Sequence, residues 1–151
     1  MSLSVKSLKN ESVDIWDRFV DAHPEGTVFH KTGWLKLIDP VIEIIAVFEN
    51  EEIKAGVALI KTKKNTVQGF HIPAYTQYFS PLITTVPGKE RSLTGEHECV
   101  KLILDELKDA KHIDFKLPRG HQYILPYHWK GFESSVRITY IITDDSNPFQ
   151  W

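Results

Sequence analysis

The segment Val41–Phe48 constrains the fold most, because its residues are apolar except for Glu43. Pro40 precedes it and Asn50 follows it closely, and a short apolar run between turn residues is more typical of a β-strand than of a helix. A strand with one wet face would alternate in polarity, so this run predicts a strand covered on both faces. We therefore expect a central strand with other structure packed on each side.

The chain that follows has the pattern of an antiparallel meander. A turn at Asn50–Glu52 leads to a strand at Ile53–Lys61, and a turn at Lys61–Asn65 leads to another at Thr66–Ile72. Gly56 indicates a bulge or a close approach of other atoms to the second strand. Three such strands predict the centre of a mixed sheet in an α/β (α+β) protein.

Apolar residues at three- and four-residue spacing predict three helices that flank the sheet. The first is capped by Asn10 or Ser12, the second by Thr32 and the third by Thr94. The side chains expected to face the core are Val13, Trp16, Phe19 and Val20 in the first, Trp34, Leu37 and Ile38 in the second, and Val100, Ile103, Leu104 and Leu107 in the third.

Three more segments have strand character. Leu3–Leu8 alternates weakly and predicts a short edge strand, and His112–Leu117 follows the third helix, which implies a parallel strand. Val136–Thr143 predicts a further strand whose edge could pair with a second copy in a homodimer. Phe149 and Trp151 are large apolar residues for a terminal tail, and they predict that more protein follows.

The regular pattern ends in Gly69–Leu82, which we call the aromatic loop. Two prolines in it remove backbone donors, so a strand ladder cannot continue through it. Tyr75, Gln77 and Tyr78 supply hydroxyl and amide groups beside aromatic rings, and ligand clefts use this mixture, so these are the predicted substrate-binding residues. The same residues are compatible with a loop whose tyrosines plug the edge of the core and keep their hydroxyls in water.

Length and composition exclude several classes of protein. A chain of 151 residues predicts one domain. A net charge of −2 with interspersed signs does not indicate a DNA-binding protein. The single cysteine, Cys99, excludes an internal disulfide, and no apolar segment approaches the roughly 20 residues of a membrane helix. Without a secretory signal pattern, the sequence predicts a cytoplasmic protein with no membrane insertion.

Several short signatures resemble the N-terminal half of the FemAB-like proteins, which are related to the GNAT acyltransferases. They are Trp16–Val20, Pro24–His30, Trp34–Leu35, Pro73–Leu82, Trp129–Phe132 and Thr139–Ile142. The resemblance implies one GNAT-like domain over residues 1–151, with a mixed sheet whose central antiparallel meander is flanked by helices. It also implies transfer of an acyl or aminoacyl group to an amine on a small molecule or peptide, with cell-wall precursors as acceptors in the best-known branch. Such proteins carry a second GNAT-like domain in cis, so this half alone is expected to be inactive.

The chain departs from the GNAT pattern at the cofactor. GNAT enzymes hold the cofactor pyrophosphate in a Gln/Arg-x-x-Gly-x-Gly/Ala turn at a helix start, where free backbone N–H groups attract anions. Gly88, Lys89 and Arg91 could contact a phosphate, but their spacing differs and Glu90 opposes an anion. No cofactor-binding residue is therefore predicted here, and an acyl-CoA or aminoacyl-tRNA donor, as the resemblance implies, would bind the second domain.

Acyl transfer to an amine needs a general base within hydrogen-bond reach of the nitrogen. His71, beside the aromatic loop, and Glu43, within the central strand, are the candidates. A single histidine next to Phe70 is, however, more often a packed or surface residue than a base. Glu43 is either a buried carboxylate with a raised pKa or an edge residue that faces water.

The other chemically interesting residues have structural explanations. His30 lies next to a predicted helix start, where it can form a local cap. Trp34 is expected in the core, and Cys99 has no neighbour that would form a thiolate, so it is expected to be inert. The seven histidines lack the spacing of zinc sites, so no metal is predicted.

Two hypotheses from different classes remain. The chain is either the substrate-shaping half of an acyl- or aminoacyltransferase, or a non-catalytic module that binds a ligand or protein on the same fold. The length of the natural gene product separates them, because only the transferase needs a further domain.

Overall fold

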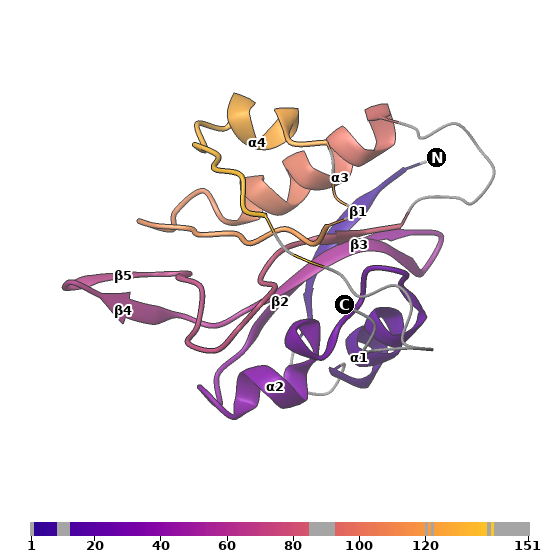
Figure 1. The fold of residues 1–151 in the computed structure, drawn as a ribbon. Helices are drawn as coiled ribbons and strands as arrows, with labels where there is room; N and C mark the ends of the chain where they lie inside the picture. The colour runs from indigo at the N-terminus through magenta and orange to yellow at the C-terminus, as the bar shows by residue number, and fades with distance from the viewer. Residues whose placement is uncertain are drawn as a thin grey trace, which may run out of the picture.

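A computed structural model describes residues 2–8, 13–84, 93–119, 121, 123–138 and 140. Its centre is a four-stranded antiparallel sheet in the order β1-β2-β3-β6, with helices on both faces (Figure 1). The strands are β1 Ser4–Leu8, β2 Glu43–Glu49, β3 Glu52–Leu59 and β6 Leu82–Ile83. The predicted mixed α/β (α+β) class with a central antiparallel sheet is therefore confirmed.

The central strand is β2, as its apolar run predicts. Its residues Ile44–Phe48 are buried, and it pairs with β1 on one side and β3 on the other. The edge position predicted for the first strand is also confirmed. Asn50 and Glu51 connect β2 to β3 with φ angles of 49° and 68°, the left-handed pair that a two-residue hairpin turn requires.

Gly56 allows a helix to approach β3 closely. A Cβ atom at this position would lie 2.7 Å from Cζ3 of Trp16 and 2.8 Å from the carbonyl oxygen of Ile45. The register irregularity lies instead where Val47 pairs with Ala55 and Phe48 with Ile53. Of the two explanations for this glycine, the close approach is confirmed.

Helices cover the sheet on both sides (Figure 1). α1 Val13–Ala22 packs on one face with Trp16 and Val20 buried, as predicted. α3 Leu93–Glu106 packs on the other face and buries Val100, Ile103 and Leu104, which confirms its predicted stripe, and Leu107 is buried just beyond it. Thr94 lies inside α3 rather than at its cap, and the predicted caps of α1 lie outside the described residues. α4 Leu125–Trp129 follows.

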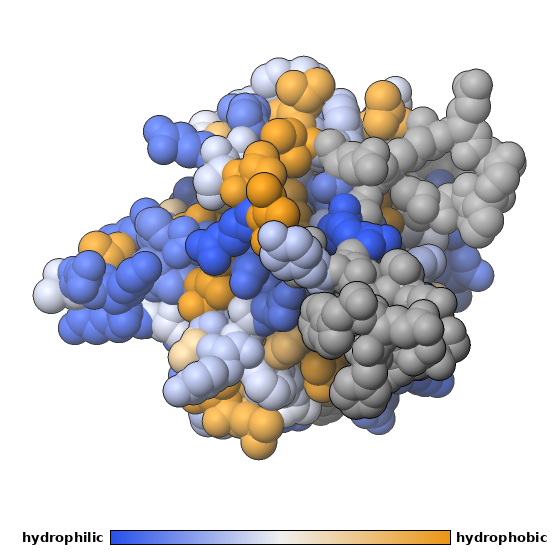
Figure 2. Space-filling model, viewed as in Figure 1, coloured by the Kyte–Doolittle hydropathy of each residue, from blue (hydrophilic) through white to orange (hydrophobic). Residues whose placement is uncertain are grey.

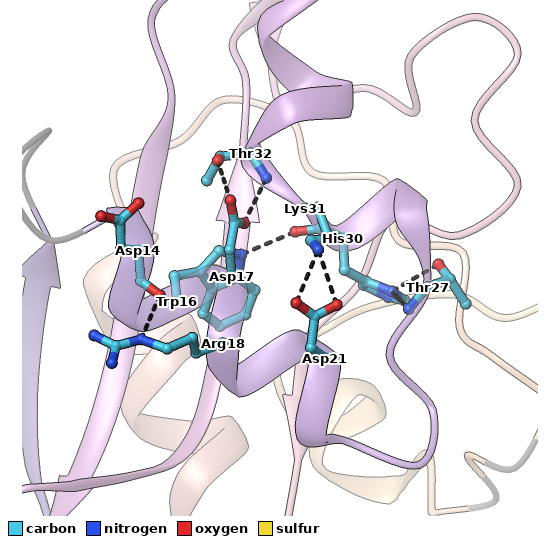
Figure 3. Close-up of polar contacts among 9 residues, drawn as sticks. All are labelled: Asp14, Trp16, Asp17, Arg18, Asp21, Thr27, His30, Lys31 and Thr32. Atoms are coloured by element: carbon cyan, nitrogen blue, oxygen red, sulfur yellow. Dashed lines mark hydrogen bonds and ion pairs between the residues drawn. The ribbon is translucent and has the colours of Figure 1, made fainter.

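The second helix differs from the prediction. α2 Thr32–Lys36 buries Leu35 completely, whereas Leu37 and Ile38 are 80% and 41% exposed. The reason is a polar anchor on α1 (Figure 3). The Asp17 carboxylate accepts hydrogen bonds from the Thr32 backbone N–H at 2.9 Å and from the Thr32 hydroxyl at 2.7 Å, so Thr32 is not a helix cap and the anchored end turns Leu35 inward.

The predicted three-stranded meander is wrong in its third strand. β4 Thr62–Lys64 and β5 Val67–Gly69 form a separate two-stranded hairpin, which projects from one side of the molecule in Figure 1. The chain reverses at Asn65 and Thr66, where φ is 48° and 70°, so part of the expected turn becomes a strand. β6, which follows the aromatic loop, takes the place beside β3.

The predicted strand His112–Leu117 forms single bridges rather than a continuous ladder. Ile113 makes a parallel bridge to Phe70, and Lys116 makes an antiparallel bridge to Phe79. The predicted parallel pairing is thus confirmed at one position. The segment 112–116 therefore bonds to both arms of the aromatic loop.

The predicted strand Val136–Thr143 is wrong over its described part. Among the residues that the structure describes, 136–138 and 140 form no ladder, and Val136, Ile138 and Tyr140 are almost fully exposed because no described strand covers them. Figure 2 shows hydrophobic side chains on the face that the segment after α4 crosses. Residues 139, 141–143, 149 and 151 lie outside the described part. Among the helices described, none is long and apolar enough to cross a bilayer.

Candidate functional site

Backbone hydrogen bonds hold both arms of the aromatic loop. On the first arm, the Phe70 N–H donates to the His112 carbonyl at 2.9 Å and the Phe70 carbonyl accepts from the Asp114 N–H at 2.8 Å. On the second, Phe79 and Lys116 exchange both of their backbone bonds, at 3.1 and 2.9 Å. Phe70 and Phe79 are buried, so the arms are fixed by packing as well.

A tight turn forms the tip of the loop. The Thr76 N–H donates to the Pro73 carbonyl at 3.2 Å, and the Trp34 indole N–H donates to the Thr76 hydroxyl at 3.1 Å. Trp34 is half-buried and meets the ring of Phe29 edge-on. This tryptophan therefore positions the loop in addition to its packing role.

Tyr78 anchors the loop on its other side. Its ring is stacked on His30 with an interplanar angle of 3° and centroids 6.3 Å apart, and it meets Phe29 edge-on. His30 is buried, and its Nδ1 accepts a hydrogen bond from the Thr27 N–H at 3.2 Å (Figure 3). Burial, together with the charge of His23, lowers the pKa of His30 to about 4, so the ring is neutral. His30 therefore has a local capping role, as predicted, but it caps the Val28–His30 turn rather than the start of α2.

The three predicted substrate residues separate into two groups. Tyr75, on the tight turn, is 93% exposed, and Gln77, just after it, is exposed, whereas Tyr78 is half-buried against the Val28–His30 turn. Tyr75 also has a φ of 58°, a left-handed conformation that glycine adopts freely and that L residues other than asparagine and aspartate adopt at a cost. The tip thus presents one ring and one amide to solvent on a well-anchored support.

A hollow of about 390 Å³ lies elsewhere, between α1 and the β2–β3 turn. It is lined by Ile15, Arg18, Phe19, Glu51, Glu52 and Ile53. None of the predicted site residues lines it, and its mixed charges do not match any ligand class that the sequence indicates.

The two candidate bases lie apart from the exposed tip. Glu43 begins β2 and forms an ion pair with Lys61 at 2.7 Å, with 38% of its side chain exposed. Of the two alternatives for Glu43, a buried carboxylate or an edge residue that faces water, the structure shows the second. His71 is 6% exposed, and both of its ring nitrogens have polar partners, Nδ1 the Asp114 Oδ2 at 3.4 Å and Nε2 the Val67 carbonyl at 3.1 Å.

Sequence reasoning missed the partners of His71. Asp114 and His112 alternate along the segment that pairs with Phe70, so both lie on the face that His71 occupies on the neighbouring segment. The alternating pattern of 112–117 contains this signal, but it becomes informative only when the pairing with residues 69–71 is known.

Two other predictions concern reactive groups. Cys99 is buried, and burial with nearby glutamates raises the pKa of its thiol to about 11, which agrees with an inert cysteine. Gly88, Lys89, Glu90 and Arg91, the residues weighed for phosphate contact, lie outside the described part of the chain.

The chain matches no protein-family model and no curated protein. It is similar to a solved structure, that of a predicted acetyltransferase with acetyl-CoA from Clostridium acetobutylicum. The two share 13% sequence identity over 93% of this chain and 96% of that chain, with a TM-score of 0.46. A likeness this distant assigns no activity to the chain.

Proposed function

We propose that this chain is the substrate-shaping domain of a GNAT-like acyl- or aminoacyltransferase, and that the tip of its aromatic loop binds the amine acceptor. The supporting observation is Tyr75, which is 93% exposed in a left-handed conformation on an otherwise anchored turn. Such strain persists only where the surrounding structure imposes it, and it is concentrated at functional sites. The family signatures in the sequence supply the reaction class.

The exposed groups suit a peptide-like amine. The face of the Tyr75 ring attracts an ammonium group, and the Gln77 amide can both donate and accept hydrogen bonds with a peptide backbone. An anchored loop loses little conformational freedom on binding, because Trp34 and Tyr78 already hold it. Tyr78 then contributes as a support of the tip rather than as a direct contact.

The catalytic base and the acyl donor belong, in this proposal, to a second domain in cis. Both ring nitrogens of His71 have polar partners, and the ring is buried, so it does not face an acceptor bound at the tip. Glu43 is engaged by Lys61. An acyl-CoA or aminoacyl-tRNA donor would likewise be held outside this chain.

The same placement of His71 and Glu43 favours the second candidate, a module on this fold that binds a peptide or protein without turnover. Both candidates use the loop tip for binding and differ only in the transfer step. A transfer assay with the full natural gene product, acetyl-CoA and a lysine-containing peptide separates them. Acetylated peptide detected by mass spectrometry supports the transferase, whereas binding without any product supports the module.

Binding at the tip is tested by following the backbone amide signals of this protein in NMR while a lysine-containing peptide is added. We expect the signals of residues 73–78 to shift, and the peptide with an acetylated lysine to bind more weakly because its charge is gone. Tyr75→Ala should weaken binding about tenfold or more, as an exposed aromatic anchor does at its contact.

Matched controls lie on the same molecule. Tyr140 is 97% exposed and Gln68 is exposed on β5, and both lie outside residues 73–78, so Tyr140→Ala and Gln68→Ala remove the same groups from other positions and should leave the affinity unchanged. Shifts that avoid residues 73–78, or equal losses for Tyr75→Ala and Tyr140→Ala, would remove the tip from the proposal.

A further inference from the structure

Three side chains with metal-binding groups converge between the first arm of the aromatic loop and the segment that follows α3. His71, His112 and Asp114 each offer one ligand atom, and these atoms lie within 4.8 Å of one another. The His112 Nε2 is 2.9 Å from the Asp114 Oδ1, and the His71 Nδ1 is 3.4 Å from the Asp114 Oδ2. We propose that these residues bind a divalent transition-metal ion of the Zn²⁺ type.

Backbone pairing explains why the three groups meet. Phe70 pairs with Ile113 in a parallel bridge, so His71 lies beside Asp114 and Gly69 lies beside His112. A Cβ atom at Gly69 would lie 2.5 Å from the His112 carbonyl oxygen and 2.9 Å from the His112 Cβ. The glycine thus leaves the room that His112 needs, and the two imidazole rings stack with centroids 4.4 Å apart.

The hydrogen bond at the other nitrogen of His71 favours a cation at Nδ1. The Val67 carbonyl can only accept, so the His71 Nε2, 3.1 Å away, must carry the donated proton. With that proton on Nε2, a neutral His71 ring presents the lone pair of Nδ1 toward the Asp114 carboxylate, an arrangement that either a second proton or a metal cation between the two groups stabilises. Metal-binding histidines commonly donate their second N–H to a backbone carbonyl in this way, which fixes the tautomer and the ring orientation.

The donor set and its spacing fit zinc. Zn²⁺ binds imidazole nitrogen and carboxylate oxygen at about 2.0–2.2 Å, so neighbouring donors in a tetrahedral shell are about 3.3 Å apart. Each imidazole lies at about that spacing from one oxygen of the same carboxylate, the His112 Nε2 at 2.9 Å from Oδ1 and the His71 Nδ1 at 3.4 Å from Oδ2, and one ligand atom from each residue lies within 4.8 Å of the others. His71 is buried, while 43% of the His112 side chain and 36% of the Asp114 side chain are exposed, which gives an ion a route from solvent. Three protein ligands leave a position for water or an exogenous ligand.

A metal here would join segments that few backbone bonds connect. His71 follows the β4–β5 hairpin, and His112 and Asp114 belong to the segment that makes only single bridges. Ion binding to the folded state alone would therefore raise stability by mass action. This inference does not depend on the proposed function, because it uses neither the loop tip nor a transfer step.

The test is a titration of untagged, EDTA-treated protein with ZnCl₂ in competition with a chromogenic chelator. We expect one equivalent of zinc to bind and the melting temperature to rise with it. Because His71 is buried, the primary variants are His112→Ala and the isosteric Asp114→Asn. Each should weaken zinc binding more than about 100-fold, since even loss of a residue that only orients a ligand costs 10–100-fold.

Controls and a direct probe complete the experiment. His128 and Asp14 are exposed and distant in sequence from the cluster, and His128→Ala and Asp14→Asn should leave zinc binding unchanged. Imidazole nitrogen NMR shifts should identify the His71 Nδ1 and the His112 Nε2 as the zinc-bound atoms. The proposal is overturned if the wild-type protein takes up no stoichiometric zinc, if His112→Ala and Asp114→Asn bind it as well as the controls, or if both His71 nitrogens stay protonated in saturating zinc.

Discussion

The paired centre of the sheet and the region around the aromatic loop differ in the extent of their backbone pairing and in the polarity of their buried side chains. β2 and β3 pair along their whole length, and apolar side chains cover them from both faces. Around the loop, the segment 112–116 makes single bridges at Phe70 and Phe79, and buried polar side chains such as His71 and Thr76 lie close by. The first region stabilises the fold, and the second positions chemical groups.

The contrast shows how one chain can combine a stable sheet with a candidate site. An uninterrupted ladder satisfies its backbone groups internally and leaves its side chains for packing. Where the ladder is interrupted, side chains and single backbone bonds take over, and polar residues find partners in the interior. Each prediction below separates the two regions by a different measurement, in order of decreasing expected effect.

The largest loss of unfolding free energy should come from a substitution on the face of the sheet that α1 covers. Trp16 is fully buried over Gly56, and its indole N–H donates to the His30 carbonyl at 2.9 Å. Trp16→Ala removes this packing and leaves a cavity, so the free energy of unfolding in urea should fall by about 3–5 kcal/mol. Trp129, which is 64% exposed, is the matched control, and Trp129→Ala should cost less than about 1 kcal/mol. Similar losses for both would mean that the covered face does not dominate stability.

The second prediction concerns the pH dependence of stability, which tests whether the buried His30 supports the loop. Burial lowers the pKa of His30 from 6.5 to about 4, so the unfolded state binds the proton more tightly. The contribution of neutral, buried His30 to the unfolding free energy should be fully present above about pH 6.5. It should be lost as the pH decreases toward about 4, by on the order of 2–3 kcal/mol. Urea unfolding at several pH values measures this slope.

The variant His30→Gln tests whether this pH dependence of stability is due to His30. His30→Gln should flatten the pH dependence, while His128→Gln, at an exposed position, should keep it. Because Tyr78 stacks on His30, the NMR signals of the loop should broaden or move over the same pH range. A slope that persists in His30→Gln would assign the acid sensitivity to other groups.

The paired centre was largely predictable from sequence, and the region around the loop was not. The apolar run at Val41–Phe48 and the spacing of Trp16 and Val20 depend on burial alone, which a local pattern records. Leu35 was missed because a contact between Asp17 and Thr32 turns α2, and no periodicity within five helical residues contains that information.

The candidate sites show the same division. The sequence indicated the exposed tyrosine and glutamine at the tip, because prolines and polar aromatic residues act locally. The cluster of His71, His112 and Asp114 depends on a parallel pairing between segments far apart in the chain. The expectation that no metal binds rested on ligand spacing within the sequence, which such a pairing bypasses.

The third prediction compares the effect of an added methyl group on stability at two glycines, Gly69 and Gly33. Gly69→Ala places a Cβ atom against the backbone of His112, so it should cost about 1–3 kcal/mol of unfolding free energy and should weaken any zinc binding with it. A Cβ atom added at Gly33, in α2, would meet nothing within 4 Å, and Gly33→Ala should be neutral or gain up to about 1 kcal/mol. Equal stabilities for the two variants would show that the loop arm can shift away from the segment 112–116 without cost.

The smallest effect separates stability from binding at the tip. Tyr75→Gly relieves the left-handed backbone but adds freedom to the unfolded chain, so the unfolding free energy should change by between zero and a gain of about 1 kcal/mol. Tyr140→Gly also removes an exposed ring, but Tyr140 is not among the described residues with a left-handed backbone, so this variant should not gain stability. The lysine-containing peptide should lose affinity only for Tyr75→Gly. If Tyr75→Gly instead lowered the unfolding free energy markedly, the ring of Tyr75 would have to pack against the protein in solution. Its presence would then be explained by stability, and a binding role at the tip would lose its support.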